Sequence, residues 1–150
     1  MTNPSTNASA NASTNASTNA SANSVTRFGN IPSGAGGQRL PFSPAVRAGD
    51  FVFCSGQVAM KDNGEIETGG IESQTRRTME NVKKVLALAG CNLEDVVKVC
   101  VWLDDTRDFW TFNRIYTEYF GEHAPARSCV QSAMMVDCKV EIEVTAYKPL

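Results

Sequence analysis

The sequence predicts an α+β fold in which two helices cover one face of a single β-sheet. Segments of strand character and segments of helical periodicity follow one another in the order β-β-α-β-α-β-β. The chain has 150 residues, of which 42% are hydrophobic, and this suits one core. Both helices are crossovers between strands, so we expect them on the same face. The uncovered face still carries apolar positions, which favours contact with another subunit.

Three parts are predicted along the chain. Residues 1–26 are mainly Asn, Ala, Ser and Thr. Such a segment cannot bury enough apolar surface to offset the entropy of ordering it, so we expect a disordered tail. Residues 27–40 are rich in glycine and are predicted to form a lead-in loop. The folded domain is expected over residues 41–150.

The first half of this domain predicts two strands and a helix. Residues 41–47 and 51–57 flank a turn signal and are expected to form neighbouring strands. Apolar residues then recur every three or four positions from Ile71 to Ala89, with charged residues between them. This pattern predicts an amphipathic helix, which Gly90 ends.

The second half predicts a strand, a helix and two further strands. Residues 96–103 are rich in β-branched residues, which is typical of a buried strand. Residues 104–106 can cap a helix whose aromatic stripe is interpreted as core, namely Phe109, Phe112, Tyr116, Tyr119 and Phe120. The last strands are expected over residues 128–133 and 139–147. In the latter, apolar residues alternate with polar ones that include Glu141 and Glu143.

Composition disfavours several classes of protein. The formal net charge is -2 and no Lys/Arg run occurs, so we expect no nucleic-acid partner. The chain has no apolar run of membrane-spanning length and no secretory signal, so we expect no membrane partner and a cytoplasmic location. Five cysteines and one histidine show no metal-ligand spacing, which predicts a reducing compartment and no metal site.

Arg127 is the residue most suggestive of chemistry. Its guanidinium stays charged and needs an anionic partner or open water. One interpretation is an ion pair with Glu141 or Glu143 on a neighbouring strand. The other is a bound carboxylate, with a nearby glutamate that deprotonates a water molecule. A catalytic pair of Cys129 and His123 is a weaker alternative, because nothing in the sequence ensures that the two side chains meet.

The chain resembles the RidA/YjgF family of enamine and imine deaminases over roughly residues 41–148. The segments that carry the resemblance are Arg-Ala-Gly-Asp at 47–50, Phe-Val-Phe-Cys-Ser-Gly-Gln at 51–57, the helix at 75–90, residues 108–116, Pro-Ala-Arg-Ser-Cys-Val at 125–130 and Lys-Val-Glu-Ile-Glu at 139–143.

This resemblance implies a chorismate-mutase-like α+β fold that assembles as a homotrimer, with active sites in the clefts between subunits. It implies hydrolysis of 2-imino acids and their enamine tautomers, such as 2-aminoacrylate and 2-iminopropionate, to 2-keto acids and ammonia. Pyridoxal-phosphate-dependent dehydratases release such compounds. No cofactor is implied, because an imine is already electrophilic.

The resemblance also implies roles for individual residues. Arg127 would bind the substrate carboxylate, and Glu141 would position the hydrolytic water. Main-chain groups of Gly56 and Cys129 would contact the ligand, and the pocket would be lined by Ser55 and Asn113. Two departures bear on specificity: Phe42 stands where many relatives have tyrosine, and the loop at residues 121–125 is shorter than in many relatives.

Two other functions remain open. The protein could be a regulatory trimer that binds small carboxylates without converting them, in which case Arg127 would matter and Glu141 would not. A chaperone-like or ribonuclease role is the other alternative, and the acidic balance of the chain disfavours RNA binding.

Overall fold

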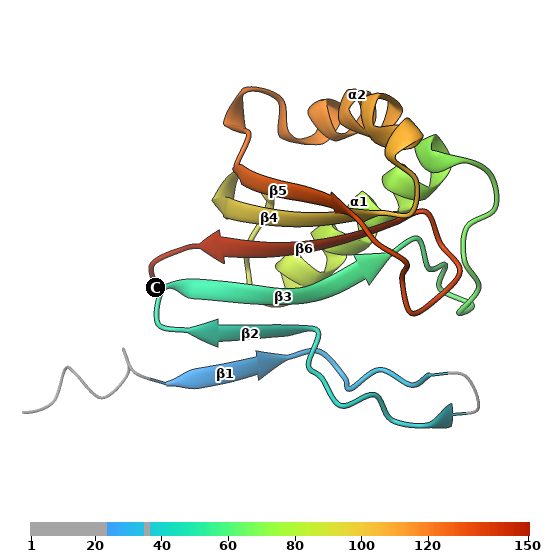
Figure 1. Cartoon of the computed structure of the whole chain (residues 1–150). Helices are drawn as coiled ribbons and strands as arrows, with labels where there is room; N and C mark the ends of the chain where they lie inside the picture. Colours follow the sequence, from blue (N-terminus) through green and yellow to red (C-terminus); the bar gives the residue numbers. More distant parts are fainter. Residues whose placement is uncertain (1–23, 35–36) are drawn as a thin grey trace, which may run out of the picture.

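A mixed six-stranded sheet and two helices make up the computed structural model, which describes residues 24–34 and 37–150 (Figure 1). The predicted tail lies largely outside the described residues. The strands are β1 (Val25–Phe28), β2 (Ala45–Ala48), β3 (Phe51–Val58), β4 (Val96–Leu103), β5 (Ala126–Gln131) and β6 (Val140–Tyr147). The helices are α1 (Ile71–Leu88) and α2 (Phe109–Phe120). The predicted α+β fold is confirmed.

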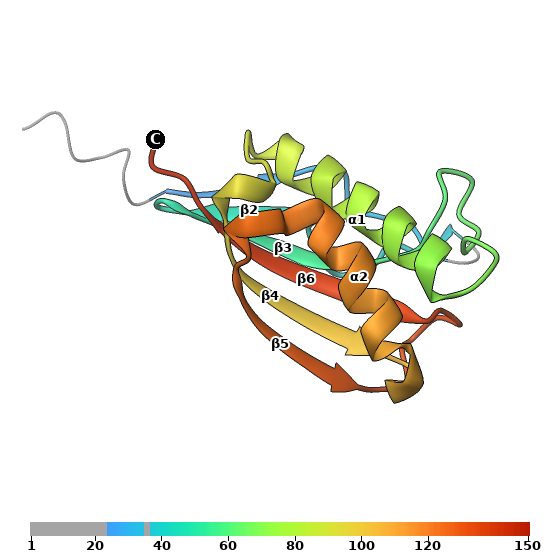
Figure 2. The same ribbon diagram turned by 90° about the horizontal axis from the view of Figure 1, so that it is seen from above.

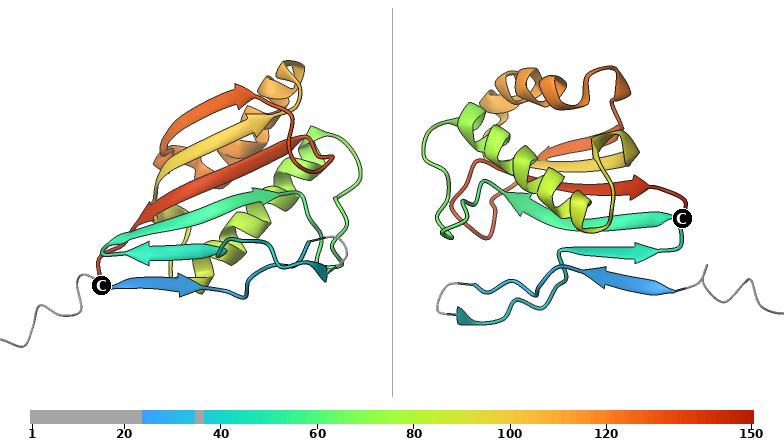
Figure 3. Two further views of the ribbon diagram at one scale, coloured as in Figure 1. Left: turned by 60° about the horizontal axis from the view of Figure 1, so that its bottom comes forward. Right: turned by 180° about the vertical axis from the view of Figure 1, so that it is seen from behind.

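The sheet has the strand order β1-β2-β3-β6-β4-β5. All neighbours are antiparallel except β4 and β5, which are parallel because α2 carries the chain back across the sheet between them. Both helices lie on one face, as predicted (Figure 2). The opposite face carries no helix (Figure 3, left), and we call it the open face.

Helix α1 begins and ends close to the predicted positions. Its buried side chains include Met79, Val82 and Leu86, which lie at the three- and four-residue spacing of one helix face. Gly90 has a φ of 71°, a left-handed conformation that favours glycine and stops the helix. The 18-residue helix is therefore set by its apolar periodicity and its final glycine.

Helix α2 starts after a short 3₁₀ turn, η3 (Thr106–Asp108), in which the Asp105 side chain accepts a hydrogen bond from the Arg107 amide. The predicted cap is therefore present, but it caps the 3₁₀ turn. Phe112, Tyr116 and Phe120 are buried against the sheet, as the aromatic stripe predicts.

The N-terminal strand corrects the predicted boundaries. Residues 25–28 form β1, which pairs with β2, where the sequence predicts the end of the tail and the start of the loop. Three of its four residues are exposed, so main-chain pairing at the sheet edge holds it rather than burial. β5 also begins at Ala126, two residues before the predicted start.

A bulge interrupts the pairing of β3 with β6. Cys54 pairs with Val144 and Gln57 pairs with Ile142, so Ser55 and Gly56 together oppose one residue of β6. A bulge changes the local direction of the backbone, so this one sets the orientation of Gly56 relative to β6.

Candidate functional site

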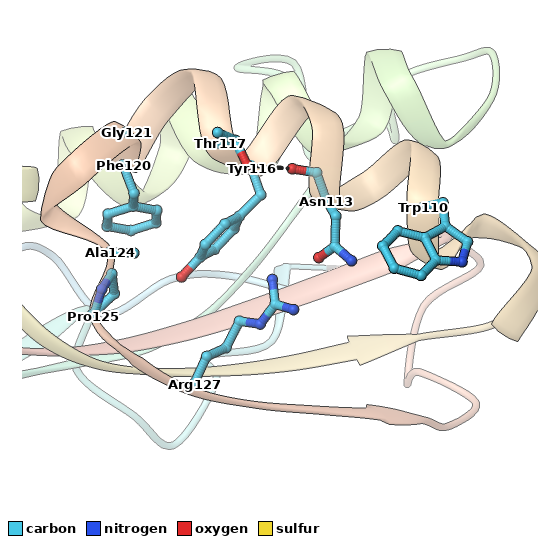
Figure 4. A pocket seen from close by; sticks show the side chains of 9 residues that line it. All are labelled: Trp110, Asn113, Tyr116, Thr117, Phe120, Gly121, Ala124, Pro125 and Arg127. Atoms are coloured by element: carbon cyan, nitrogen blue, oxygen red, sulfur yellow. Dashed lines mark hydrogen bonds between the residues drawn. The ribbon is translucent and has the colours of Figure 1, made fainter.

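Arg127 lies beside a cavity of about 420 Å³ between β5 and α2 (Figure 4). We call this the Arg127 cavity. It is lined by Trp110, Asn113, Tyr116, Thr117, Phe120, Gly121, Ala124, Pro125 and Arg127. The cavity therefore combines one cation and a few polar groups with a largely apolar wall, as small-molecule sites commonly do.

The Arg127 guanidinium is held by aromatic rings. Its Cζ lies 4.8 Å from the ring centroid of Tyr116, 5.6 Å from that of Phe112 and 5.9 Å from that of Phe109. These cation–π contacts orient the side chain without using its hydrogen-bond donors. Among residues 24–34 and 37–150, Arg127 forms no ion pair and its guanidinium donates no hydrogen bond. Its donors thus remain available to an anion.

Two further polar atoms on the cavity wall lack partners. Asn113 Oδ1 and Tyr116 Oη are buried, and neither has a hydrogen-bond partner within the described part of the chain. Desolvation raises the pKa of Tyr116 to about 12, against the opposing effect of Arg127, so its hydroxyl stays protonated at neutral pH. An unpaired buried polar atom costs about 1–3 kcal/mol. This arrangement favours a site at which a ligand or a water molecule supplies the missing partners.

Glu141 lies on the open face of the sheet. Its neighbours Val140 and Ile142 are fully buried beneath the helices, and side chains alternate along a strand, so Glu141 points the other way. A Cβ atom added to Gly56 would overlap the Glu141 carboxylate, so that carboxylate rests on the Gly56 backbone. Desolvation, and then the charge of Glu143, raise the pKa of Glu141.

Arg127 and Glu141 therefore occupy opposite faces of one sheet. Arg127 pairs in register with Val99 and shares the helix-covered side, whereas Glu141 pairs with Trp102 and shares the open face. An ion pair of Arg127 with Glu141 or Glu143 does not form within the chain. A site that uses both residues needs a second chain.

The other predicted site residues also fall into two groups: some line a cavity on the helix-covered side, and the others lie away from both cavities. Asn113 lies at the Arg127 cavity, and Cys129 lines a smaller neighbouring cavity of about 220 Å³. Ser55 lies at the bulge, where its hydroxyl donates to the Ser43 carbonyl over 2.7 Å. Phe42 is exposed before β2 and lines neither cavity.

The structure disfavours a Cys129–His123 pair. No hydrogen bond joins the two side chains in the described regions, and desolvation raises the pKa of the Cys129 thiol. A partly buried thiol with a raised pKa is a poor nucleophile at neutral pH.

Trp110 is a cavity residue that sequence analysis does not identify. It follows Phe109 but lies off the buried stripe, and one turn separates it from Asn113. The available signal is a tryptophan on the polar side of an amphipathic helix, which is an unusual place for so large an apolar side chain.

No group of three or more His, Cys, Asp or Glu side chains able to hold a metal ion occurs in the described ranges. None of the described helices combines the length and apolar character needed to cross a membrane. All five cysteines are present as thiols.

Comparison with known proteins identifies the family. The family model for endoribonuclease L-PSP matches residues 36–148. A RutC family protein of Pyrococcus horikoshii is 47% identical over 110 residues, which cover 72% of this chain and 87% of the relative. TdcF of Escherichia coli, provisionally named a reactive intermediate deaminase, is 39% identical over 113 residues, with the same coverage. The chain belongs to the endoribonuclease L-PSP family, also called YjgF/RidA.

Solved structures agree with this assignment. The crystal structure of yeast Mmf1 matches with a TM-score of 0.75 and 32% identity, covering 83% of this chain and 99% of that one. The crystal structure of E. coli TdcF with bound serine matches with a TM-score of 0.72 and 36% identity, covering 82% and 98%.

Proposed function

We propose that the protein is a homotrimeric deaminase that hydrolyses 2-imino acids, and their enamine tautomers, to 2-keto acids and ammonia. The observation that carries this proposal is the Arg127 guanidinium, which lies beside a cavity with no anionic partner in the described part of the chain. A planar, forked cation is suited to bidentate binding of a carboxylate. The name of TdcF and its serine-bound crystal structure support a family of small-molecule deaminases.

Glu141 supplies the second group that hydrolysis requires. Its carboxylate lies on the open face against Gly56, so we place the reaction where the open face of one subunit meets the Arg127 cavity of the next. Because the two residues lie on opposite faces of the sheet, only an assembly can bring one copy of each together. A closed homotrimer provides three equivalent clefts of this kind.

The chemistry needs no group beyond these residues. Arg127 binds the substrate carboxylate, and Glu141 orients a water molecule and accepts its proton. The water oxygen forms a bond to the imine carbon, and Glu141 passes the first water proton to the nitrogen, which gives a carbinolamine. The hydroxyl proton of the carbinolamine then moves to the nitrogen as the C–N bond breaks, which releases ammonia and leaves a 2-keto acid. Such imines arise when dehydratases that use pyridoxal phosphate act on serine or threonine, so we infer that these enzymes supply the substrate.

Other residues complete the proposed site. Main-chain groups of Gly56 and Cys129 contact the ligand, and Asn113 lines the Arg127 cavity one helical turn after Trp110. Phe42 and Ser55, together with Gly56 and Glu141, would come from the neighbouring subunit, because none of the four lines the Arg127 cavity. The proposed location remains the cytoplasm.

The proposal is tested in a threonine dehydratase reaction to which the full-length protein is added. We expect faster release of 2-keto acid and ammonia, and Arg127→Ala should abolish the acceleration while the oligomer persists. Arg114→Ala, which removes an exposed arginine of α2 that pairs with Glu72 and lines neither cavity, is the matched control and should leave the acceleration intact. Unchanged release with intact wild-type oligomer would refute the deaminase activity.

Glu141→Gln separates the enzyme from a regulatory carboxylate-binding trimer. An enzyme should lose turnover and keep its affinity for a 2-keto acid, because the carboxylate is bound by Arg127 and the water is activated by Glu141. A protein that only binds carboxylates would show no turnover before the substitution.

A further inference from the structure

We propose that Trp110 extends the substrate range of the site from the three- and four-carbon imines that dehydratases release to 2-imino acids that carry a bulky apolar or aromatic side chain. This inference rests on the proposed function, and it concerns a part of the Arg127 cavity that binding of a carboxylate and water does not use. Trp110 becomes the specificity-determining residue of the site.

Trp110 lies on the side of α2 that lines the cavity. Trp110, Asn113, Thr117 and Gly121 recur at intervals of three and four residues and all line the cavity. They form a second stripe of α2, next to the buried stripe that packs on the sheet. Trp110 occupies the first turn of this cavity stripe, at the end away from Phe120 and Pro125 (Figure 4).

The indole of Trp110 is open to solvent. Trp110 is 79% exposed, whereas Phe112 and Phe120 on the adjacent stripe are almost fully buried. The indole meets the Phe109 ring edge-on, at a centroid distance of 5.3 Å. A single exposed apolar side chain is ordinary on a protein surface, but this one borders the same cavity as the unpaired guanidinium. Its indole face therefore remains available to a ligand.

The cavity is large enough for a ligand that reaches from Arg127 to Trp110. The cavity volume of about 420 Å³ lies within the roughly 300–1,000 Å³ range of pockets for drug-sized ligands. Within one chain, an imino acid with only three or four carbon atoms fills a small part of that volume. With its carboxylate on Arg127, a larger ligand can extend its side chain along the cavity stripe onto the indole, where aromatic packing adds to the burial of apolar surface.

The charge pattern restricts the side chain further. Arg127 is the charged residue among those lining the cavity, and the wall toward Trp110 offers one amide and one hydroxyl, from Asn113 and Thr117. The Thr117 hydroxyl already donates to the Asn113 carbonyl over 2.9 Å. A second charge on the ligand would lack a partner at this wall, so apolar side chains are favoured over charged ones.

The test measures substrate preference with imines generated in place by an L-amino-acid oxidase, with catalase present. Release of 2-keto acid above the spontaneous rate is compared for imines made from alanine and from phenylalanine. We expect Trp110→Ala to lower kcat/KM for the phenylalanine-derived imine about tenfold, and that for the alanine-derived imine less than twofold. Trp110→Phe should recover most of the loss. Leu88→Ala removes an exposed apolar side chain of α1 outside the cavity and should change neither value.

A binding measurement separates this inference from the proposed function. Calorimetric titration with phenylpyruvate and pyruvate should show about a tenfold weaker Kd for phenylpyruvate in Trp110→Ala and little change for pyruvate. If no imine is turned over but this difference in binding persists, the deaminase proposal fails and the role of Trp110 stands. The specificity role would be overturned if Trp110→Ala changed kcat/KM and Kd equally for the large and the small ligand, whether or not light scattering shows a change in oligomeric state.

Discussion

Two arginines show how one residue type serves two purposes in this protein. Arg47 is 7% exposed, and its guanidinium donates to the main-chain carbonyls of Ala89 and Lys148. Arg127 is packed against aromatic rings and has no acceptor in the described part of the chain. Donors satisfied by the fold indicate a structural role, and donors left open beside a cavity indicate a ligand.

The environment of Glu141 predicts a pH-dependent rate. Desolvation, assisted by the charge of Glu143, raises the pKa of Glu141 above its ordinary value. Because water activation needs the carboxylate form, kcat should rise with pH through this raised pKa and then level off. The measurement is a pH profile of imine hydrolysis. If the residual activity of Glu141→Gln still falls at low pH as that of the wild type does, the group that titrates is not Glu141.

The same shift has a consequence for stability. A carboxyl whose pKa is raised in the fold binds a proton more tightly there than in the unfolded chain. Its contribution to stability is therefore complete below the ordinary pKa and is lost as pH rises through the folded-state pKa. Urea unfolding across this range should show a weaker pH dependence for Glu141→Gln than for the wild type.

At the scale of elements, Arg47 ties three parts of the fold together. It lies on β2 and is buried there, and its guanidinium donates hydrogen bonds to the carbonyl oxygens of Ala89, which follows α1, and Lys148, which follows β6. A cation beside the C-terminal carbonyls of a helix is also favoured by the helix dipole. This junction fixes α1 against the sheet at the end away from the bulge.

Replacing Arg47 should therefore destabilise the fold, although Arg47 is not a residue of the proposed site. We expect Arg47→Met to lower the free energy of unfolding by about 3 kcal/mol, because one buried and one partly buried carbonyl lose a charged donor. Arg39→Met changes an exposed arginine and should cost less than about 0.5 kcal/mol. Urea denaturation at one fixed protein concentration measures both. Equal stabilities for the two variants would contradict the structural role of Arg47.

At the scale of the whole molecule, the open face is the main unpartnered surface of the described chain. Phe51, Phe53 and Tyr147 are each more than 40% exposed there, and the Phe51 ring contacts both of the others. We therefore expect another chain to cover this apolar surface. Glu141 lies on the same face, so assembly and catalysis are expected to depend on the same surface.

This surface predicts that one charge on the open face will disrupt assembly and activity together. Phe53→Lys should dissociate the oligomer, since an unpaired charge at an apolar interface is costly. Leu88→Lys, which places the same charge on an exposed position of α1, should leave the oligomer intact. Light scattering coupled to chromatography gives the molar mass, and imine hydrolysis gives the activity. A monomeric but fully active Phe53→Lys variant would contradict a site shared between chains.

Much of the fold follows from local patterns in the sequence. Apolar periodicity and Gly90 define α1, the alternation in residues 139–147 defines β6, and the aromatic stripe defines the buried side of α2. These features are local, because each depends on the spacing of residues within one element. β1 is different: its four residues are mostly exposed, and it exists because β2 offers main-chain partners.

By itself, then, the sequence determined the α+β class, the family and the identity of Arg127 and Glu141 as the residues to examine. Only the tertiary structure decided that these two side chains lie on opposite faces, that the indole of Trp110 borders the same cavity as Arg127, and that the Glu141 carboxylate rests on Gly56. The physical reason is that the period of a strand shows which residues share a face with one another. Which face the helices cover at each strand depends on pairing register and on the bulge at Ser55 and Gly56, and both arise between elements distant in the chain.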